Sequence, residues 1–159
     1  MARGNDPVVL TPGGLDRLEA ELTHLKTTRR AEVAAWFAEI QGSAGGDAEQ
    51  ELERLAVREE MGLVEGRIAQ LEMVLANAVV AEPALREAGV ADVGARVTVE
   101  DEGEEDTYVL VSPAESSARR GHISIASPVG AALLHHRGGD VVQVETPAGS
   151  RALKILRVE

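Results

Sequence analysis

Negative charge is concentrated in a short polar stretch in the N-terminal half of the chain. Residues 42–54 read GSAGGDAEQELER, in which a glycine-rich turn is followed by four carboxylates in seven residues. Carboxylate oxygens are hard ligands of the kind that Mg²⁺ prefers, and Mg²⁺ ions support phosphoryl chemistry. A turn of this composition could present such ligands to a reaction centre.

The same residues also fit a purely structural role. Asp47-x-x-Gln50 has the spacing of a capping box, in which Asp47 accepts from the N–H of Gln50 and the Gln50 side chain reaches back to the N–H of Asp47. Glu49 and Glu51 would lie near the positive end of a helix dipole, where negative charge is mildly stabilising. A cap needs only one acid, so this role explains part of the charge.

Helical periodicity lies on both sides of this turn. Thr11 and Pro12 suit the N-cap and the first position of a helix, although two glycines follow. Apolar residues then recur at spacings of three and four on each side. The first stripe is Leu15, Leu18, Leu22, Leu25, Val33, Trp36, Phe37 and Ile40, and the second is Val57, Met61, Val64, Ile68, Leu71, Leu75 and Ala78. Two arms of about 30 residues, each roughly 45 Å long, predict an antiparallel coiled-coil helical hairpin over residues 1–80, with its acidic tip near residues 45–53.

The period of the pattern changes after residue 80. Residues 81–94 contain one proline and two glycines and are predicted to form a linker. Beyond it, alternating apolar and polar residues predict five strands, at 95–100, 107–112, 122–126, 140–146 and 151–159. Ser127 as N-cap and Pro128 at the first helical position predict a short helix over 127–134. The acidic run between the first two strands is expected to be a solvated hairpin turn. Residues 95–159 therefore form a small antiparallel sheet domain with one short helix, and the chain is of the α+β class.

Composition excludes several classes of protein. Twenty-seven acidic against sixteen basic residues give a formal charge of −11, so any contact with nucleic acid would be indirect. The chain has no cysteine, which rules out disulfides, thiol nucleophiles and cysteine zinc sites. No signal peptide and no apolar run of about 18 residues is present. A soluble cytoplasmic protein with no membrane partner is expected.

The order of parts, a helical hairpin with an acidic tip followed by a compact sheet domain, resembles the bacterial GreA/GreB transcript-cleavage factors and their non-cleaving relatives. The resemblance covers nearly the whole chain and is carried by the segments LTPGGLDRLEAELTHLKTTRR, VREEMGLVEGRIAQLE and ISIASPVGAALLHHRGGDVVQVETPAG. It implies an FKBP-like sheet domain that docks at the rim of the secondary channel of RNA polymerase, and a hairpin that enters the channel.

In that family, tip carboxylates help to hold the second Mg²⁺ ion that cleaves backtracked RNA. The resemblance therefore implies an accessory factor rather than an enzyme. Such a factor has no cofactor of its own, uses the Mg²⁺ of RNA polymerase in the complex, and meets the 3′ end of the nascent RNA only indirectly.

Matching the tip to that family residue by residue exposes a departure. Counting back from the shared Arg58-Glu59 pair, Asp47 matches the family's tip aspartate, whereas the family's tip glutamate falls on Gln50. A glutamine carbonyl is a poorer Mg²⁺ ligand than a carboxylate. Glu49 and Glu51 flank this position, but neighbours on a helix point about 100° away, and the preceding loop is longer than in the cleavage factors. The implied tip residues are Asp47, Glu49, Gln50 and Glu51, with Asp47, Glu49 and Glu51 as ligands of a Mg²⁺ ion shared in the complex.

The resemblance also implies two sets of contact residues outside the tip. A basic patch near the RNA is matched by Arg29, Arg30, Arg54 and Arg58, which could equally be ordinary salt-bridged surface residues. The segment by which the sheet domain meets polymerase is matched by Ser127, Pro128, His135, Arg137 and Asp140, although Ser-Pro is also a common helix start. The adjacent His135 and His136 have no third metal ligand nearby in sequence and are expected to be surface histidines.

Three functions stay open at this point. The first is a polymerase-binding elongation regulator, expected to be a monomer, that either stimulates cleavage or occupies the channel without efficient cleavage. Gln50 and the longer loop favour the second outcome. A prolyl isomerase would need aromatic faces around its proline pocket, and the C-terminal half has only Tyr108. The third function is a coiled-coil interaction or dimerisation module unrelated to polymerase.

Overall fold

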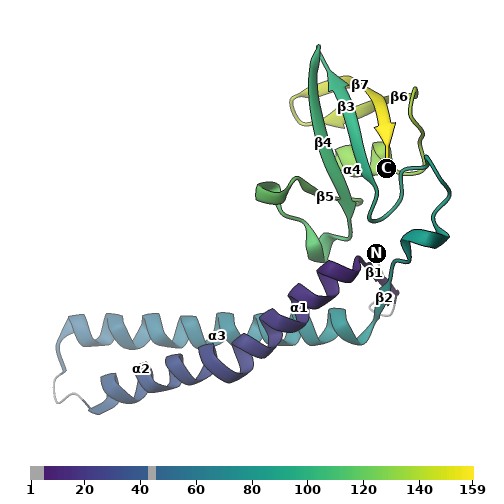
Figure 1. Cartoon of the computed structure of the whole chain (residues 1–159). Coiled ribbons are helices and arrows are strands. Elements are labelled where there is room, and N and C mark those ends of the chain that lie inside the picture. The colour runs from purple at the N-terminus through teal and green to yellow at the C-terminus, as the bar shows by residue number, and fades with distance from the viewer. Residues whose placement is uncertain (1–5, 43–45) are drawn as a thin grey trace. The chain divides into compact units, whose positions relative to one another are not determined.

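The structure, a computed structural model, describes residues 6–42 and 46–159, which fall into two compact units. One unit is Asp16–Asn77, and the other joins Met1–Leu15 to Ala78–Glu159. The expected fold class is confirmed, because a long helical hairpin precedes a small domain built on a curled sheet (Figure 1). Residue 45, the first of the predicted tip, lies outside the described residues.

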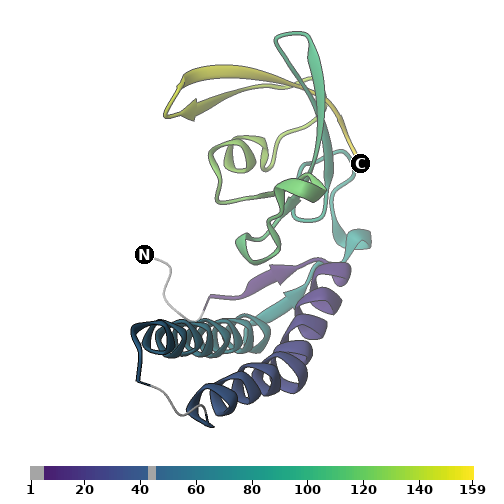
Figure 2. The ribbon, with the colours of Figure 1, turned by 90° about the vertical axis from the view of Figure 1, so that its left-hand side faces the viewer.

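Two helical arms, side by side in both ribbon views, form the hairpin (Figures 1 and 2). The first arm consists of α1 (Pro12–His24), a π-helical turn (Leu25–Arg29) and α2 (Arg30–Gly42), and the second arm is α3 (Ala48–Ala76). The core between them contains Val33, Ile40, Val57, Val64 and Ile68, with Leu22, Leu25 and Phe37 packed against it. Three residues of the predicted apolar stripes do not belong to the buried face of the hairpin. Trp36 and Met61 are exposed, and Ala78 lies beyond the end of α3, in a strand.

The π-helical turn restores the phase of the first stripe. Leu25 and Val33 are eight residues apart, one more than the repeat of a heptad seam. A π turn closes its hydrogen bonds between residues i and i+5 and therefore contains about one residue more than an α turn. The N–H of Arg30 accordingly bonds to the carbonyl of Leu25. As a result, both Leu25 and Val33 belong to the hairpin core.

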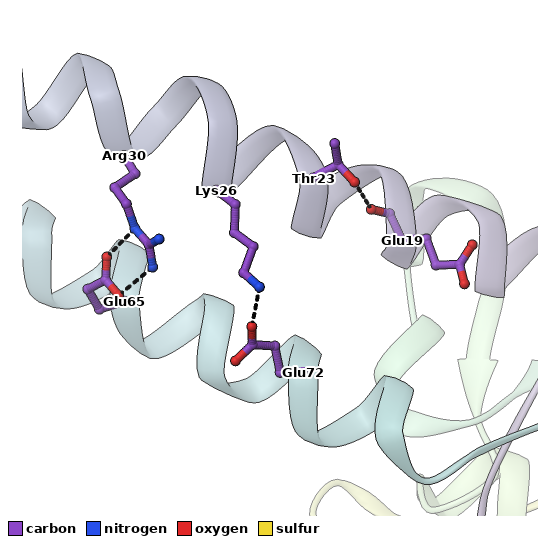
Figure 3. A network of polar contacts seen from close by, with 6 residues as sticks. All are labelled: Glu19, Thr23, Lys26, Arg30, Glu65 and Glu72. Carbon is purple, nitrogen blue, oxygen red and sulfur yellow. Dashed lines mark hydrogen bonds and ion pairs between the residues drawn. The ribbon is translucent and has the colours of Figure 1, made fainter.

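Ion pairs join the two arms of the hairpin at exposed positions. Arg30 forms a bidentate pair with Glu65 at 2.7 and 2.8 Å, and Lys26 pairs with Glu72 (Figure 3). The same arrangement recurs in the pairs Arg29–Glu60 and Arg67–Glu21. Exposed pairs of this kind add little stability each, so their main effect is to favour one register of the two arms.

The second unit contains a two-stranded and a five-stranded sheet. Strands β1 (Val8–Leu10) and β2 (Ala78–Val80) pair in parallel. The larger sheet has the order β5-β4-β3-β7-β6. Its strands are β3 (Arg96–Asp101), β4 (Glu104–Val111), β5 (His122–Ser124), β6 (Val141–Thr146) and β7 (Gly149–Val158). Between β5 and β6 lies the short helix α4 (Pro128–Leu133), and 3₁₀ turns lie at Pro83–Leu85, Pro113–Glu115 and Ala118–Arg120.

One continuous core holds this sheet and α4 together. Its buried members are Ala91, Ala95, Val97, Val99, Leu110, Leu133, Val142, Val144, Leu153 and Ile155. Alternate residues of β6 are buried, as the sequence pattern predicts for a strand with one covered face.

Two details of the larger sheet differ from the expected antiparallel arrangement. Strands β4 and β5 pair in parallel, with Val109 beside His122, because the two 3₁₀ turns between them return the chain to the same end of the sheet. The acidic hairpin is also tighter than expected, since its strands continue to Asp101 and resume at Glu104. Only Glu102 and Gly103 remain in the turn, with φ of 52° and 91°, and positive φ at both positions suits a two-residue hairpin.

Candidate functional site

The acidic tip is built on the N-terminus of α3. Asp47 is the N-cap residue in an extended conformation, and its Oδ1 accepts a hydrogen bond from the N–H of Gln50 at 3.0 Å. This bond satisfies one of the amides that a helix start leaves unpaired. Glu49 and Glu51 follow in the first turn, where the helix dipole favours negative charge, and both are exposed.

Gln50 forms only half of the predicted capping box. Its N–H donates to Asp47, but within residues 6–42 and 46–159 its buried Oε1 has no hydrogen-bond partner. The expected return bond, from the N–H of Asp47 to this oxygen, is therefore not formed. A buried amide oxygen is also not presented to solvent, where an approaching ion would meet it.

The tip does not form a metal site on its own. No group of three or more His, Cys, Asp or Glu side chains in the described part of the chain could hold a metal ion. The cap already engages one carboxylate oxygen of Asp47, and Glu49 and Glu51 are two positions apart, so they point about 200° apart around the helix. Mg²⁺ requires near-octahedral oxygen ligands. The tip residues therefore do not fit a resident Mg²⁺ ion.

Most arginines of the expected basic patch are engaged by carboxylates. The pairs are Arg29 with Glu60 and Glu32, Arg30 with Glu65, and Arg54 with Glu51. The hydrogen bonds that Arg29 and Arg30 donate to Glu60 and Glu65, respectively, raise the pKa of both arginines, and the hydrogen bond from Arg30 in turn lowers the pKa of Glu65. Among the described residues, Arg58 forms no ion pair. Three of the four arginines are thus neutralised in the free protein.

The helix α4 starts at the predicted residues. Ser127 caps it, because its Oγ accepts from the N–H of Gly130 at 3.1 Å and donates to the carbonyl of Ser124 at 2.6 Å. Pro128 occupies the first helical position, where a missing N–H is harmless. Gly130 lies against the end of β5, since a Cβ at this position would be 2.0 Å from the Ser124 carbonyl oxygen.

The turn after α4, residues 135–140, is organised by Asp140. Its Oδ2 accepts from the N–H of Arg137 at 2.9 Å and lies 3.2 Å from Nδ1 of His136. The hydrogen bonds from Arg137 and His136 lower the pKa of Asp140. His135 has a left-handed φ of 68°, and the Arg137 guanidinium pairs with Glu87. The structure thus brings His135, Arg137 and Asp140 into one turn, whereas Ser127 and Pro128 lie at the other end of α4.

A buried carboxylate at the start of the hairpin was not indicated by the sequence. Glu115 is 7% exposed and accepts hydrogen bonds from the N–H of Thr11 at 2.8 Å and from its hydroxyl at 2.5 Å. The Thr11 hydroxyl oxygen accepts in turn from the N–H of Gly14 at 3.0 Å, so it caps α1 as expected. Gly14 is required here, because a Cβ would overlap the Glu115 carboxylate. No local pattern could reveal a contact between residues 104 positions apart.

Comparison with known proteins identifies both halves of the chain. The family model described as "Transcription elongation factor, N-terminal" matches residues 8–80, and "Transcription elongation factor, GreA/GreB, C-term" matches residues 86–159. Transcription elongation factor GreA of Thermoanaerobacter pseudethanolicus is 44% identical over 154 residues, which cover 96% of this chain and 97% of the relative. The GreA of Chloroflexus aggregans is 40% identical with the same coverage. Among solved structures, the crystal structure of GreA factor homolog 1 (Gfh1) of Thermus thermophilus matches with 34% sequence identity. The match covers 96% of this chain and 99% of the Gfh1 chain, with a TM-score of 0.46.

The two family models, which cover the helical hairpin and the five-stranded sheet, both describe a transcription elongation factor. The chain belongs to the GreA/GreB family. Its relatives are named elongation factors, which are accessory proteins rather than enzymes themselves, and this agrees with the expectation for this chain. In the described ranges, no helix has both the length and the apolar character needed to cross a membrane.

Proposed function

We propose that this chain is a regulator of transcription elongation that binds RNA polymerase, inserts its hairpin into the secondary channel and does not promote efficient RNA cleavage. The observation that carries the proposal is the state of the tip. The resemblance places Gln50 at the position of the family's tip glutamate. In the structure, the Oε1 of Gln50 is buried and the Asp47 carboxylate is engaged as a helix cap. A tip with this arrangement fills space near a reaction centre but supplies few free oxygen ligands.

The proposal assigns docking at the rim of the channel to the ends of α4. The exposed turn at 135–140 is held rigid by Asp140 and carries the Arg137 guanidinium, and rigid, preorganised contacts lose little entropy on binding. Ser127 and Pro128 would contribute from the other end of the helix. The chain would act as a monomer, because its hairpin core is already closed within one chain.

A second candidate is a genuine cleavage factor. Glu49 and Glu51 are exposed in the first turn of α3, so a shift of the turn on binding could replace the missing glutamate. The polymerase would then supply the Mg²⁺ ion and its remaining ligands, because the tip alone does not fit one.

A halted, backtracked elongation complex with labelled RNA, in Mg²⁺, separates the two candidates. We expect the wild type to slow extension and to block a true cleavage factor, without shortening the RNA. Gln50→Glu is expected to gain cleavage. Shortened RNA with the wild type, lost in Asp47→Asn, would replace the first candidate with the second. No effect of any kind on the complex would contradict both.

A further inference from the structure

The segment that leads from β2 to the larger sheet forms a hollow together with the end of β7. The volume of this hollow is ≈300 Å³, and its apolar wall includes Pro83, Val90 and Val158. All of its lining residues belong to the same compact unit. Pockets for small molecules typically measure about 300–1,000 Å³, so this one suits a small ligand.

Three charged residues line the hollow, and two of them are compensated from outside its wall. Glu87 pairs with the guanidinium of Arg137, and the side-chain carboxylate of Glu159 lies 3.4 Å from Nε of Arg157. The third charged residue, Arg86, forms no ion pair within residues 6–42 and 46–159. The positive charge that remains uncompensated in the wall is therefore that of Arg86.

Arg86 also has an unsatisfied hydrogen-bond donor. Its Nε is buried and has no hydrogen-bond partner in the part of the chain that the structure describes. A buried donor without an acceptor is costly, and such groups in folded proteins are few.

The neighbouring residues do not supply this acceptor. Arg86 also lines a second hollow of ≈180 Å³, whose wall includes Glu82 and Asp92. The Asp92 carboxylate accepts from the N–H of Val93 at 2.7 Å. Glu82 forms no ion pair with Arg86 among the described residues. A ligand is thus needed to complete the surroundings of the guanidinium.

We propose that the hollow beside Arg86 binds a small organic carboxylate with an apolar body. A carboxylate matches the planar guanidinium and accepts two of its N–H groups at once. The apolar body would pack against Pro83, Val90 and Val158, which gives inorganic phosphate no comparable gain. The bound ligand would hold residues 83–90 against the end of β7. This site goes beyond polymerase binding and does not depend on it.

The test uses benzoate as the probe and the full chain labelled with ¹⁵N. We expect the amide resonances of Gly89 and Val90, which line the hollow, to shift saturably during titration. Arg86→Gln is expected to weaken binding by about tenfold or more, because hydrogen bonds to a charged group are lost. The matched control is Arg119→Gln, which removes an exposed arginine of the same unit and is expected to leave the affinity unchanged.

Two further titrations separate the roles of charge, donor geometry and apolar contact. Arg86→Lys keeps the positive charge but lacks the planar set of donors, so we expect an affinity between those of the wild type and Arg86→Gln. Inorganic phosphate is expected to bind the wild type more weakly than benzoate does. The proposal would be overturned by the absence of a saturable shift, by wild-type affinity in Arg86→Gln, or by phosphate binding as tight as that of benzoate.

Discussion

The carboxylate of Glu115 receives both the N–H and the hydroxyl of Thr11, at 2.8 and 2.5 Å, across 104 positions of sequence. Thr11 immediately precedes α1, so this pair fixes the residue from which the first arm of the hairpin starts. Burying a carboxylate is costly unless hydrogen bonds such as these compensate for the lost hydration.

Loss of the Glu115 carboxylate is expected to destabilise the unit that contains it. Glu115→Ala removes two charge-assisted hydrogen bonds at a buried site, which should lower the free energy of unfolding by about 2–3 kcal/mol. Amide hydrogen exchange read by mass spectrometry should show faster exchange at residues 8–15. Glu104→Ala, at an exposed position of β4, serves as the control, and equal exchange in the two variants would contradict the assigned role.

Two glycines with opposite surroundings give a paired prediction. Gly130→Ala places a Cβ 2.0 Å from the backbone oxygen of Ser124, which cannot move without shifting β5, so we expect a loss of more than about 2 kcal/mol. Gly62→Ala adds a methyl group in open space within α3 and should stabilise the hairpin by about 0.5–1 kcal/mol. Urea denaturation followed by circular dichroism tests both. Similar midpoints for the two variants would show that the crowding at Gly130 is relieved at little cost.

Local patterns predicted the hairpin, the start of α4 and the Asp47 cap, because each depends on residues within a few turns of one another. The same stripe contained the signal of the π-helical turn, since Leu25 and Val33 are eight rather than seven residues apart. No local sequence pattern indicated which distant segments pair. The parallel pairs β1–β2 and β4–β5, and the Glu115–Thr11 contact, depend on how the chain returns in space. At the tip, the sequence suggested a full capping box, and the missing half became visible only from the buried Gln50 Oε1.

The turn at residues 135–140 is expected to lose stability in acid. Hydrogen bonds from Arg137 and His136 lower the pKa of Asp140 in the folded protein. The stabilisation that the ionised Asp140 carboxylate gives to the folded protein is therefore fully present above the unfolded pKa of about 3.9. It is lost as the pH falls through the pKa of Asp140 in the folded protein. The stability difference between wild type and Asp140→Asn should shrink as the pH falls below about 4. Denaturation curves at several pH values measure it, and a difference that does not change with pH would contradict the assignment.

Asp47 offers a way to separate the structural and the functional role of the tip. Asparagine caps helices as well as aspartate does, so Asp47→Asn should change the free energy of unfolding by only a few tenths of a kcal/mol, whereas Asp47→Ala should cost about 1 kcal/mol. Fluorescence of the single tryptophan, Trp36, which lies in α2 of the hairpin, can follow both unfolding curves. If Asp47 acts only as a cap, the two variants will differ in stability, and Asp47→Asn will still slow RNA extension as the wild type does. If the carboxylate itself is needed, Asp47→Asn will keep its stability and lose its effect on polymerase, which would contradict a tip that acts by filling space.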